Sequence, residues 1–222
     1  MNEYPKSADT LTETVVGGRK FVRVAISSPA ALGEDSPEKF ALKYGSDRVR
    51  ADDILIFSAQ SIAIYQKNYY LLPSIKPSFI AEKISKMVKK GQMSSVFTDA
   101  RALQAGIAEL GLARFLVGVL MERFFKKGYF SKIIGEDGRL MDLCVVDDRS
   151  VLTLCPDDLM LVVENIAEEL GVRTVIADLR RDARVVAMSE SSLDTAELEE
   201  ILHDAPMRVG NRRVPMCIIR EN

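Results

Sequence analysis

The sequence is poor in the residues that build many metal and aromatic sites: it has no tryptophan, one histidine (His203) and three cysteines in 222 residues. A single histidine excludes sites with two or more imidazole ligands, such as an H-E-x-x-H zinc site. Lysine and arginine (30) are balanced by aspartate and glutamate (32), so the basic excess of a general nucleic-acid-binding protein is missing. We therefore expect no nucleic-acid partner.

Long apolar segments are missing as well. The longest run, 115–121, is far shorter than the roughly 20 residues that cross a membrane, and residues 1–20 lack the apolar stretch of a secretory signal. Cys144, Cys155 and Cys217 are odd in number and widely spaced, which favours free thiols over a disulfide framework. The sequence thus predicts a cytoplasmic protein without a membrane partner.

The residues that are abundant predict a mixed fold. Hydrophobic residues make up 47% of the chain, enough for a sizeable core, and their spacing predicts an α/β (mixed α+β) fold with mixed sheets. Residues 1–19 have few apolar anchors and are expected to form a flexible arm before a domain over 20–222, with subdomains 20–140 and 141–222 as an open alternative. Strands are expected at 20–26, 184–188 and 214–220, and helices at 77–90, 100–110, 112–125 and 195–202.

Two further segments have a more specific pattern. The apolar run at 54–65 indicates one buried strand, or two, because it shows no helical spacing. In the C-terminal third, a strand at 151–154, a helix at 156–170 and a strand at 174–177 follow one another closely. Such an order predicts a β-α-β unit, with a parallel strand pair and a right-handed crossover.

Carboxylates dominate the candidate chemistry, because seven aspartates lie within 41 positions of the chain: Asp142, Asp147, Asp148, Asp157, Asp158, Asp178 and Asp182. Asp178 directly follows the apolar strand at 174–177, and ligands of α/β sheets bind at the carboxyl ends of strands. Carboxylate oxygens suit hard cations such as Mg²⁺ or Mn²⁺. The alternatives are that Asp178 starts a turn and that Asp157 and Asp158 stabilise the start of their helix. Neither a P-loop nor a G-x-G-x-x-G fingerprint is present.

The order of several short motifs resembles the coenzyme F-420 γ-glutamyl ligase family, in its divergent ligase-like branch. The early strand D-D-I-L-I-F-S-A-Q-S-I-A-I (52–64) is similar to that family's G-D-[IV]-[LV]-V-[IV]-[ST]-x-K-[IV]-V. Further similar segments are I-K-P-S-F-I-A-E-K-I-S-K-M-V (75–88), A-E-L-G-L-A-R-F-L (108–116), K-K-G-Y-F-S-K-I-I-G (126–135), P-D-D (156–158), E-E-L-G (168–171), V-I-A-D (175–178), L-H-D-A-P (202–206) and V-P-M-C-I-I-R (214–220). The resemblance covers residues 20–220.

The resemblance implies a GTP-dependent ligase that joins glutamate to a phospholactyl deazaflavin by an amide bond, through an acyl phosphate and with Mg²⁺ or Mn²⁺. It also implies an intertwined homodimer of mixed α/β fold, and the apolar helix at 112–125 is expected either in its interface or in the core of a monomer. Asp178 matches the family's second metal-binding aspartate. The earlier one is matched by Asp147 or Asp148, with Asp142 as the rival, and the candidate nucleotide-binding residues are Gln60, Arg180 and Arg181.

Three departures from the family pattern favour an alternative function. The family's lysine in the early strand is Ser61 here, and Leu179 stands where the residue after the second aspartate should carry a hydroxyl. The family's serine and asparagine after the first aspartate are replaced by Arg149 and Ser150. The alternative is a non-catalytic homologue that acts as a dimeric binding or scaffold protein for a small molecule or nucleotide.

Overall fold

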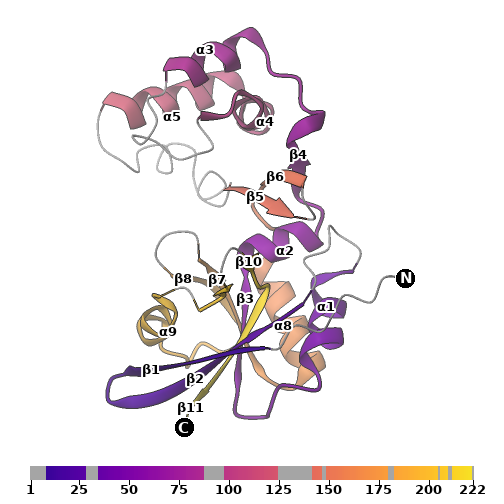
Figure 1. Cartoon of the computed structure of the whole chain (residues 1–222), viewed down its shortest axis with the longest axis vertical. Coiled ribbons are helices and arrows are strands. Elements are labelled where there is room, and N and C mark those ends of the chain that lie inside the picture. The colour runs from indigo at the N-terminus through magenta and orange to yellow at the C-terminus, as the bar shows by residue number, and fades with distance from the viewer. Residues whose placement is uncertain are drawn as a thin grey trace. The chain divides into compact units, whose positions relative to one another are not determined.

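The computed structural model describes residues 9–28, 35–87, 98–124, 142–146, 149–179, 183–204, 206–209 and 212–221 (Figure 1). The chain forms two compact units. Unit 1 combines the two ends of the chain, 1–66 and 156–222, and unit 2 is the segment 67–155 between them. These boundaries differ from the subdomains 20–140 and 141–222, because strands from both ends of the chain pair in one sheet.

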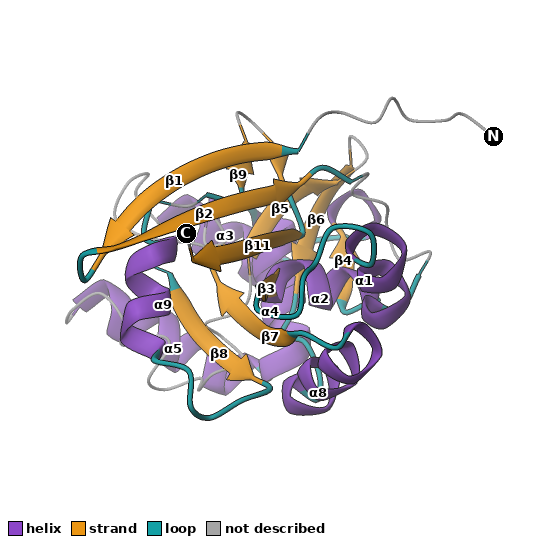
Figure 2. Ribbon diagram, turned by 90° about the horizontal axis from the view of Figure 1, so that it is seen from below, coloured by secondary structure: helices purple, strands orange, loops and turns teal. Residues whose placement is uncertain are grey.

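Unit 1 is built on a six-stranded sheet with the strand order β1-β2-β11-β3-β7-β8 (Figure 2). Only the pair β3–β7 is parallel within this sheet, so the mixed α+β class is confirmed. The strands are β1 (Thr10–Val16), β2 (Arg19–Ile26), β3 (Ile54–Ser58), β7 (Arg173–Asp178), β8 (Arg184–Met188) and β11 (Met216–Glu221), and a short separate hairpin pairs β9 (Arg208–Val209) with β10 (Arg212–Arg213).

Helices cover both faces of this sheet. On one face, which we call the α9 face, α9 (Thr195–Leu202) packs Leu198 and Ile201 against Ile56 and its neighbours. The next residue of β3, Phe57, points to the other face and contacts aromatic rings of α1 (Pro37–Gly45) and α2 (Ala59–Tyr65). α8 (Leu159–Leu170) packs against α1 and β7. The sheet is therefore buried on both sides at its centre.

Unit 2 combines a small antiparallel sheet with helices. Its strand order is β4-β6-β5, with β4 (Tyr69–Leu71), β5 (Asp142–Val146) and β6 (Arg149–Thr153). After a 3-10 turn (Leu72–Ser74) come α3 (Phe79–Met87), α4 (Ala100–Leu110) and α5 (Leu112–Phe124). α4 and α5 are separated at Gly111, whose φ of 76° is a conformation that glycine adopts without strain.

Several helix ends follow directly from the sequence. The Ser36 hydroxyl accepts a hydrogen bond from the Lys39 N–H at 3.3 Å, and Pro37 occupies the first helical position of α1. Asp194 caps α9 by accepting from the Ala196 N–H at 2.9 Å. Gly171 ends α8 in the left-handed region, with φ 64°.

Four predictions need correction. Residues 10–16, assigned to the flexible arm, form β1, because threonine at every second position and the two valines at its end fit a strand that pairs with β2 along its whole length. The run 54–65 is a strand only as far as Ser58 and then becomes α2; the two parts form one almost continuous apolar run, so periodicity could not separate them.

The other two corrections concern topology and burial. The β-α-β unit predicted at 151–177 is wrong: the strand at 151–154 (β6) belongs to the sheet of unit 2, and the parallel partner of β7 is β3. α5 is buried on one side only: Phe115 and Val119 pack with Ala81 and Leu103 in a core cluster of unit 2, whereas Val117 and Leu120 are each 49% exposed. The sequence of residues 128–134 also favours a strand, but these residues lie outside the described part of the chain.

Candidate functional site

The carboxyl ends of the two parallel strands bring two predicted site residues to one edge of the sheet. In the β3–β7 register Ser58 lies opposite Ala177, and Asp178 is the last residue of β7. Gln60 follows in the first turn of α2, and both Gln60 and Asp178 are half-buried. Ligands of α/β sheets bind outside the carboxyl ends of parallel strands. We call this edge, with Gln60 and Asp178, the carboxyl edge.

The local sequence explains why β3 ends where it does. Leu55, Ile56 and Phe57 are fully buried and hold the strand between two helical layers. The Ser58 N–H donates to the Pro215 carbonyl at 3.0 Å, which continues the pairing with the segment before β11. Strand pairing therefore fixes the backbone up to Ser58, and the chain turns into α2 with its next residue.

β8 adds a basic residue that the sequence analysis did not select. Asp178 lies opposite Arg184 in the antiparallel β7–β8 pair, after an irregularity between Ile176 and Ala177 that shifts the register. Arg184 is exposed. A guanidinium group beside the carboxyl edge is suited to an anionic ligand such as a phosphate. Only the register could have revealed it, because position 184 itself has no motif.

The remaining predicted site residues belong to unit 2 or lie outside the described residues. Asp142 is the first residue of β5 in unit 2, and its carboxylate accepts a hydrogen bond from the Leu143 N–H at 2.9 Å. The other metal and nucleotide candidates, Asp147, Asp148, Arg180 and Arg181, lie outside the described residues. Of the predicted set, the carboxyl edge therefore holds Gln60 and Asp178.

The oxygen atoms at the carboxyl edge are of the type that coordinates hard cations. The Asp178 carboxylate and the Gln60 amide carbonyl are oxygen ligands, which suit Mg²⁺ or Mn²⁺. Within the described ranges, no three His, Cys, Asp or Glu side chains are grouped as metal ligands. The two residues thus offer one or two protein oxygens to a cation that also binds a phosphate-bearing ligand.

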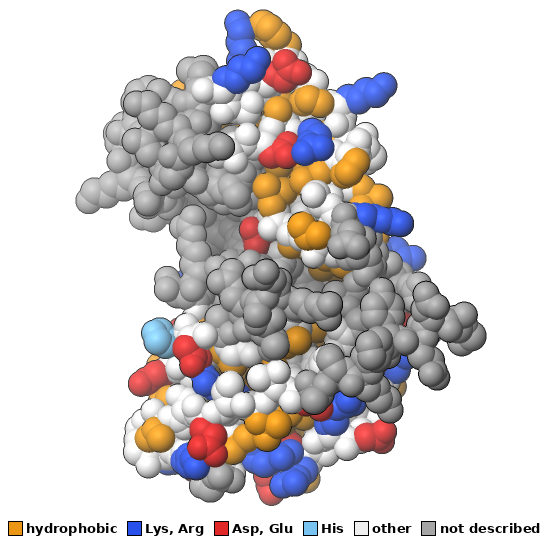
Figure 3. Space-filling model, in the orientation of Figure 1, with side chains coloured by type: hydrophobic (Ala, Val, Ile, Leu, Met, Phe, Trp, Pro, Cys, Tyr) orange, Lys and Arg blue, Asp and Glu red, His pale blue; other side chains and the backbone are white. Residues whose placement is uncertain are grey.

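Basic and apolar side chains share the surface of α3 in unit 2 (Figure 3). Lys83 and Lys86 are exposed, as is Phe79, which is 69% exposed. The Lys83 ammonium lies 4.4 Å from the centre of the Phe79 ring, a cation–π contact. The lysines of α3 are therefore a solvent-exposed face, and one of them also covers an apolar ring.

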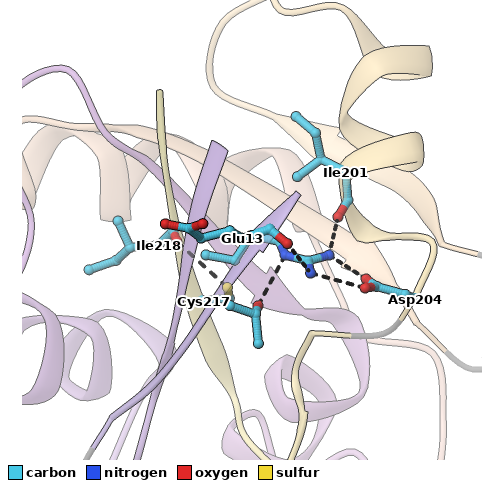
Figure 4. Close-up of polar contacts among 7 residues, drawn as sticks. Glu13, Ile201, Asp204, Cys217 and Ile218 are labelled. Carbon is cyan, nitrogen blue, oxygen red and sulfur yellow. Dashed lines mark hydrogen bonds and ion pairs between the residues drawn. The ribbon is translucent and has the colours of Figure 1, made fainter. Parts of the chain in front are cut away.

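The buried Arg23 on the α9 face of unit 1 is fully used in structural contacts (Figure 4). Its guanidinium donates to the Ile201 carbonyl at 2.9 Å, to the Thr12 hydroxyl at 3.1 Å and to both carboxylate oxygens of Asp204. The hydrogen bonds from Arg23 lower the pKa of Asp204. Because these contacts join β1, β2 and the end of α9, we assign Arg23 to stability rather than to ligand binding.

A buried thiol lies close to this network. Cys217 of β11 is fully buried, and its loss of solvation raises the pKa of the thiol to about 12. The thiol is therefore neutral at physiological pH, unlike a catalytic cysteine, whose pKa is lowered. Cys144 and Cys155 are half-buried, and all three cysteines are free, as the sequence predicts.

A cavity of about 460 Å³ lies at the opposite edge of the sheet in unit 1, where β3 and β7 begin. Ile54 and Arg173, the first residues of these two strands, line it together with Phe21 and with Leu198 and Ile201 of α9. The sequence analysis did not identify this cavity, because its lining comes from segments that are far apart in the chain. We call it the amino-edge cavity.

Comparisons with known proteins add no relative: no family model matches the chain, and no curated protein matches it. Of the helices in the part of the chain that the structure describes, none is both long and apolar enough to span a bilayer.

Proposed function

We propose that the chain is a γ-glutamyl-ligase-like protein, which forms an amide bond between a carboxyl- or phosphate-bearing small molecule and an amino acid such as glutamate. The observation that supports this proposal is the parallel β3–β7 pair, because Gln60 and Asp178 follow at the carboxyl ends of its two strands. These are two of the residues that the motif resemblance marks for metal and nucleotide binding. The coenzyme F-420 ligase resemblance supplies the reaction class.

In this reaction the γ-phosphoryl group of GTP passes to a carboxylate, which gives an acyl phosphate and GDP. The amine then attacks the acyl carbon, phosphate leaves, and the nitrogen loses a proton to form the amide. Asp178 would hold a Mg²⁺ or Mn²⁺ ion, which would neutralise charge on the transferred phosphoryl group. Gln60 would orient the nucleotide by hydrogen bonding, and Arg180 and Arg181 would bind its phosphates.

A non-catalytic homologue is the second candidate, and the position of Leu179 favours it. Leu179 follows Asp178 and packs against the apolar cluster of the α9 face. A hydroxyl-bearing residue at this position could contact a phosphate, whereas a leucine that packs against the core cannot. In this alternative the carboxyl edge still binds a small molecule or nucleotide but transfers no phosphoryl group.

Thermal unfolding with and without ligand tests the proposal. In the presence of Mg²⁺, GTP at about 100 times its Kd should stabilise the protein by about 2.7 kcal/mol, and ATP tests the choice of nucleotide. Asp178→Asn should abolish the stabilisation, whereas Asp47→Asn, a matched change of an exposed aspartate in unit 1, should leave it unchanged. Stabilisation without formation of GDP in the presence of candidate acids and amines would favour the non-catalytic homologue. No stabilisation by either nucleotide would refute both nucleotide-binding forms of the proposal.

We further propose that the protein is a homodimer in which α5 contributes to the interface. Its exposed apolar residues support this: Val117 and Leu120 are each 49% exposed, and Leu112 is 39% exposed. Apolar side chains of this kind are typical of the centre of a homodimer interface. Light scattering should report twice the chain mass of 24.7 kDa at micromolar concentration. A single chain mass there would refute the dimer, and Leu120→Glu should convert a dimer to monomers.

A further inference from the structure

The amino-edge cavity carries three guanidinium groups, and two of them are already paired. Arg19 binds Glu197 and also donates to Glu221 at 3.2 Å. Arg220 donates to both carboxylate oxygens of Asp53, at 2.8 and 2.7 Å. Neither arginine therefore has its charge available for a ligand.

Arg173 differs from the other two arginines of the cavity. Its Nη2 donates to the backbone carbonyl of Asp52 at 2.5 Å, and it forms no ion pair with any residue that the structure describes. In the sheet register it lies beside Ile54, on the α9 face. A guanidinium group has five N–H donors in a fork that matches a carboxylate. Arg173 therefore offers the cavity a half-buried, anchored site for one carboxylate.

Acidic groups with free acceptor atoms line the same cavity. Asp194 caps α9 with Oδ1, and its Oδ2 accepts from no described residue. The Asp52 side chain is also without a partner among the described residues. The lining contains four acidic side chains against three arginines, so the cavity carries a net negative charge. A simple anion is disfavoured there, whereas a ligand that carries both signs satisfies both kinds of group.

Apolar side chains form the inner surface of the cavity. Phe21, Leu198 and Ile201 are at most 4% exposed, and Ile54 is half-buried. A volume of about 460 Å³ is within the range of small-molecule sites, which are mostly apolar with a few convergent polar groups. The ligand should therefore have an apolar part as well as its two charges.

We propose that the amino-edge cavity binds a free α-amino acid with an apolar side chain. Its carboxylate pairs with Arg173, its ammonium group is accepted by Asp194 Oδ2 or the Asp52 carboxylate, and its side chain contacts Ile54 and Leu198. Glutamate fits poorly, because its second carboxylate would face the apolar inner surface. This site is separate from the carboxyl edge and does not depend on the ligase proposal, since it needs neither nucleotide nor metal.

Titration calorimetry of the full chain, without nucleotide or metal, tests the proposal with L-leucine and L-phenylalanine up to about 10 mM. Three probes separate the recognition elements: 4-methyl-2-oxopentanoate lacks the ammonium group, isopentylamine lacks the carboxylate, and glycine lacks the side chain. We expect each probe, and glutamate, to bind at least about tenfold more weakly than leucine. Equal binding of the oxo acid and leucine would overturn the zwitterion assignment, and no binding of leucine or phenylalanine would overturn the site.

Substitutions of cavity residues test whether leucine binds in the amino-edge cavity. Arg173→Met should weaken leucine binding at least about tenfold and Arg173→Lys less, because lysine keeps the charge but not the fork. Lys20→Met, a matched loss of a cation on the other face of β2, should leave binding unchanged. If Arg173→Met fails to fold, Ser192→Trp provides a second test, since Ser192 is exposed and lines the cavity, and a large ring there should block entry. Unchanged leucine affinity in folded Ser192→Trp and in folded Arg173→Met would refute the proposal.

Discussion

The ion pair between Asp53 and Arg220 gives the sharpest stability prediction, because its two partners differ in burial. Asp53 is 1% exposed, whereas the Arg220 side chain is 23% exposed. The Asp53 carboxylate accepts from Arg220 Nε at 2.8 Å and Nη2 at 2.7 Å, and from the Arg50 N–H at 2.8 Å. Its hydrogen bond to Arg220 raises the pKa of that guanidinium. Nearly all of the compensation for this buried charge therefore comes from one residue.

Replacing Arg220 with methionine keeps much of the apolar stem and removes the guanidinium. The variant leaves a buried carboxylate with a single backbone donor. Removing one partner of a buried ion pair costs about 3–5 kcal/mol, because the other charge stays buried without compensation. For a chain of this length 1 kcal/mol corresponds to about 2–4 °C, so the unfolding midpoint should fall by roughly 6–20 °C.

Urea unfolding followed by far-UV circular dichroism measures the loss, since the chain has no tryptophan for fluorescence. Arg19→Met is the matched control: the Arg19 side chain is 49% exposed, so solvent screens its ion pairs with Glu197 and Glu221, and we expect a much smaller shift of the unfolding midpoint than in Arg220→Met. Adding Asp53→Asn to Arg220→Met should restore a large part of the lost stability. The asparagine removes the buried negative charge, and its side-chain oxygen still accepts the hydrogen bond from the Arg50 N–H. A loss below about 1 kcal/mol in Arg220→Met, or no recovery in the double variant, would refute the reasoning.

Three further predictions follow from packing and protonation. A Cβ at Gly106 would lie 2.6 Å from the buried Phe115 ring, so Gly106→Ala should destabilise by about 1–3 kcal/mol in urea unfolding, whereas Gly45→Ala, with its nearest contact at 3.6 Å, should cost less. The neutral Cys217 thiol should resist iodoacetamide at pH 8 until urea unfolds the protein, and rapid labelling of Cys217 in the native protein, located by peptide mass spectrometry, would contradict its burial. Because the pKa of Asp204 is lowered in the folded state, its stabilising effect is present above about pH 4 and is lost as the pH falls further; Asp204→Asn should remove this part of the acid-unfolding curve, and an unchanged curve would contradict it.

Elements with a clear period were predictable from the sequence. α4 and α5 appear at the expected residues, and Gly111 separates them as predicted. The start of α1 is set by Ser36 and Pro37, which act through local hydrogen bonding and a fixed φ. In each case the residues that determine the helix boundary lie within a few positions of it, so the boundary can be predicted without the tertiary structure.

Other features depend on contacts that the local sequence does not contain. The change from β3 to α2 at Ser58 lies inside a continuous apolar run, and both halves are buried. The same holds for β6 and β7, whose closeness in sequence suggested a parallel pair, although each joins a different sheet. Pairing between strands is set by the whole sheet, and spacing along the chain is only an indirect guide to it.

The residues of the candidate sites also differ in whether the local sequence identifies them or only the pairing of strands does. Asp178 could be selected from the sequence because it directly follows an apolar strand, and Gln60 because of the motif resemblance. Arg184 could not, since its place beside Asp178 depends on the β7–β8 register. Arg173 stood at the start of a predicted strand without any motif, and it gains significance only from the cavity that β2, β3, β7 and α9 form together.

The parallel β3–β7 pair persists although unit 2, roughly 90 residues long, is inserted in the connection between the two strands. Increasing a loop from about 10 to about 90 residues takes about three doublings, or roughly 2 kcal/mol of closure entropy. The contacts at both ends of the insertion offset this cost. Tyr69 of β4 pairs with Thr153 of β6 within unit 2, so the folding of unit 2 itself brings the two ends of the insertion together. In unit 1, just outside them, the Gln66 amide donates to the Asp157 carbonyl and accepts from the Asp157 N–H, both at 2.8 Å. The insertion therefore enters and leaves unit 1 at Gln66 and Asp157, which the side-chain amide of Gln66 joins by two hydrogen bonds. This link at the base of the insertion helps the sheet of unit 1 to keep the β3–β7 register, at whose carboxyl ends Gln60 and Asp178 lie.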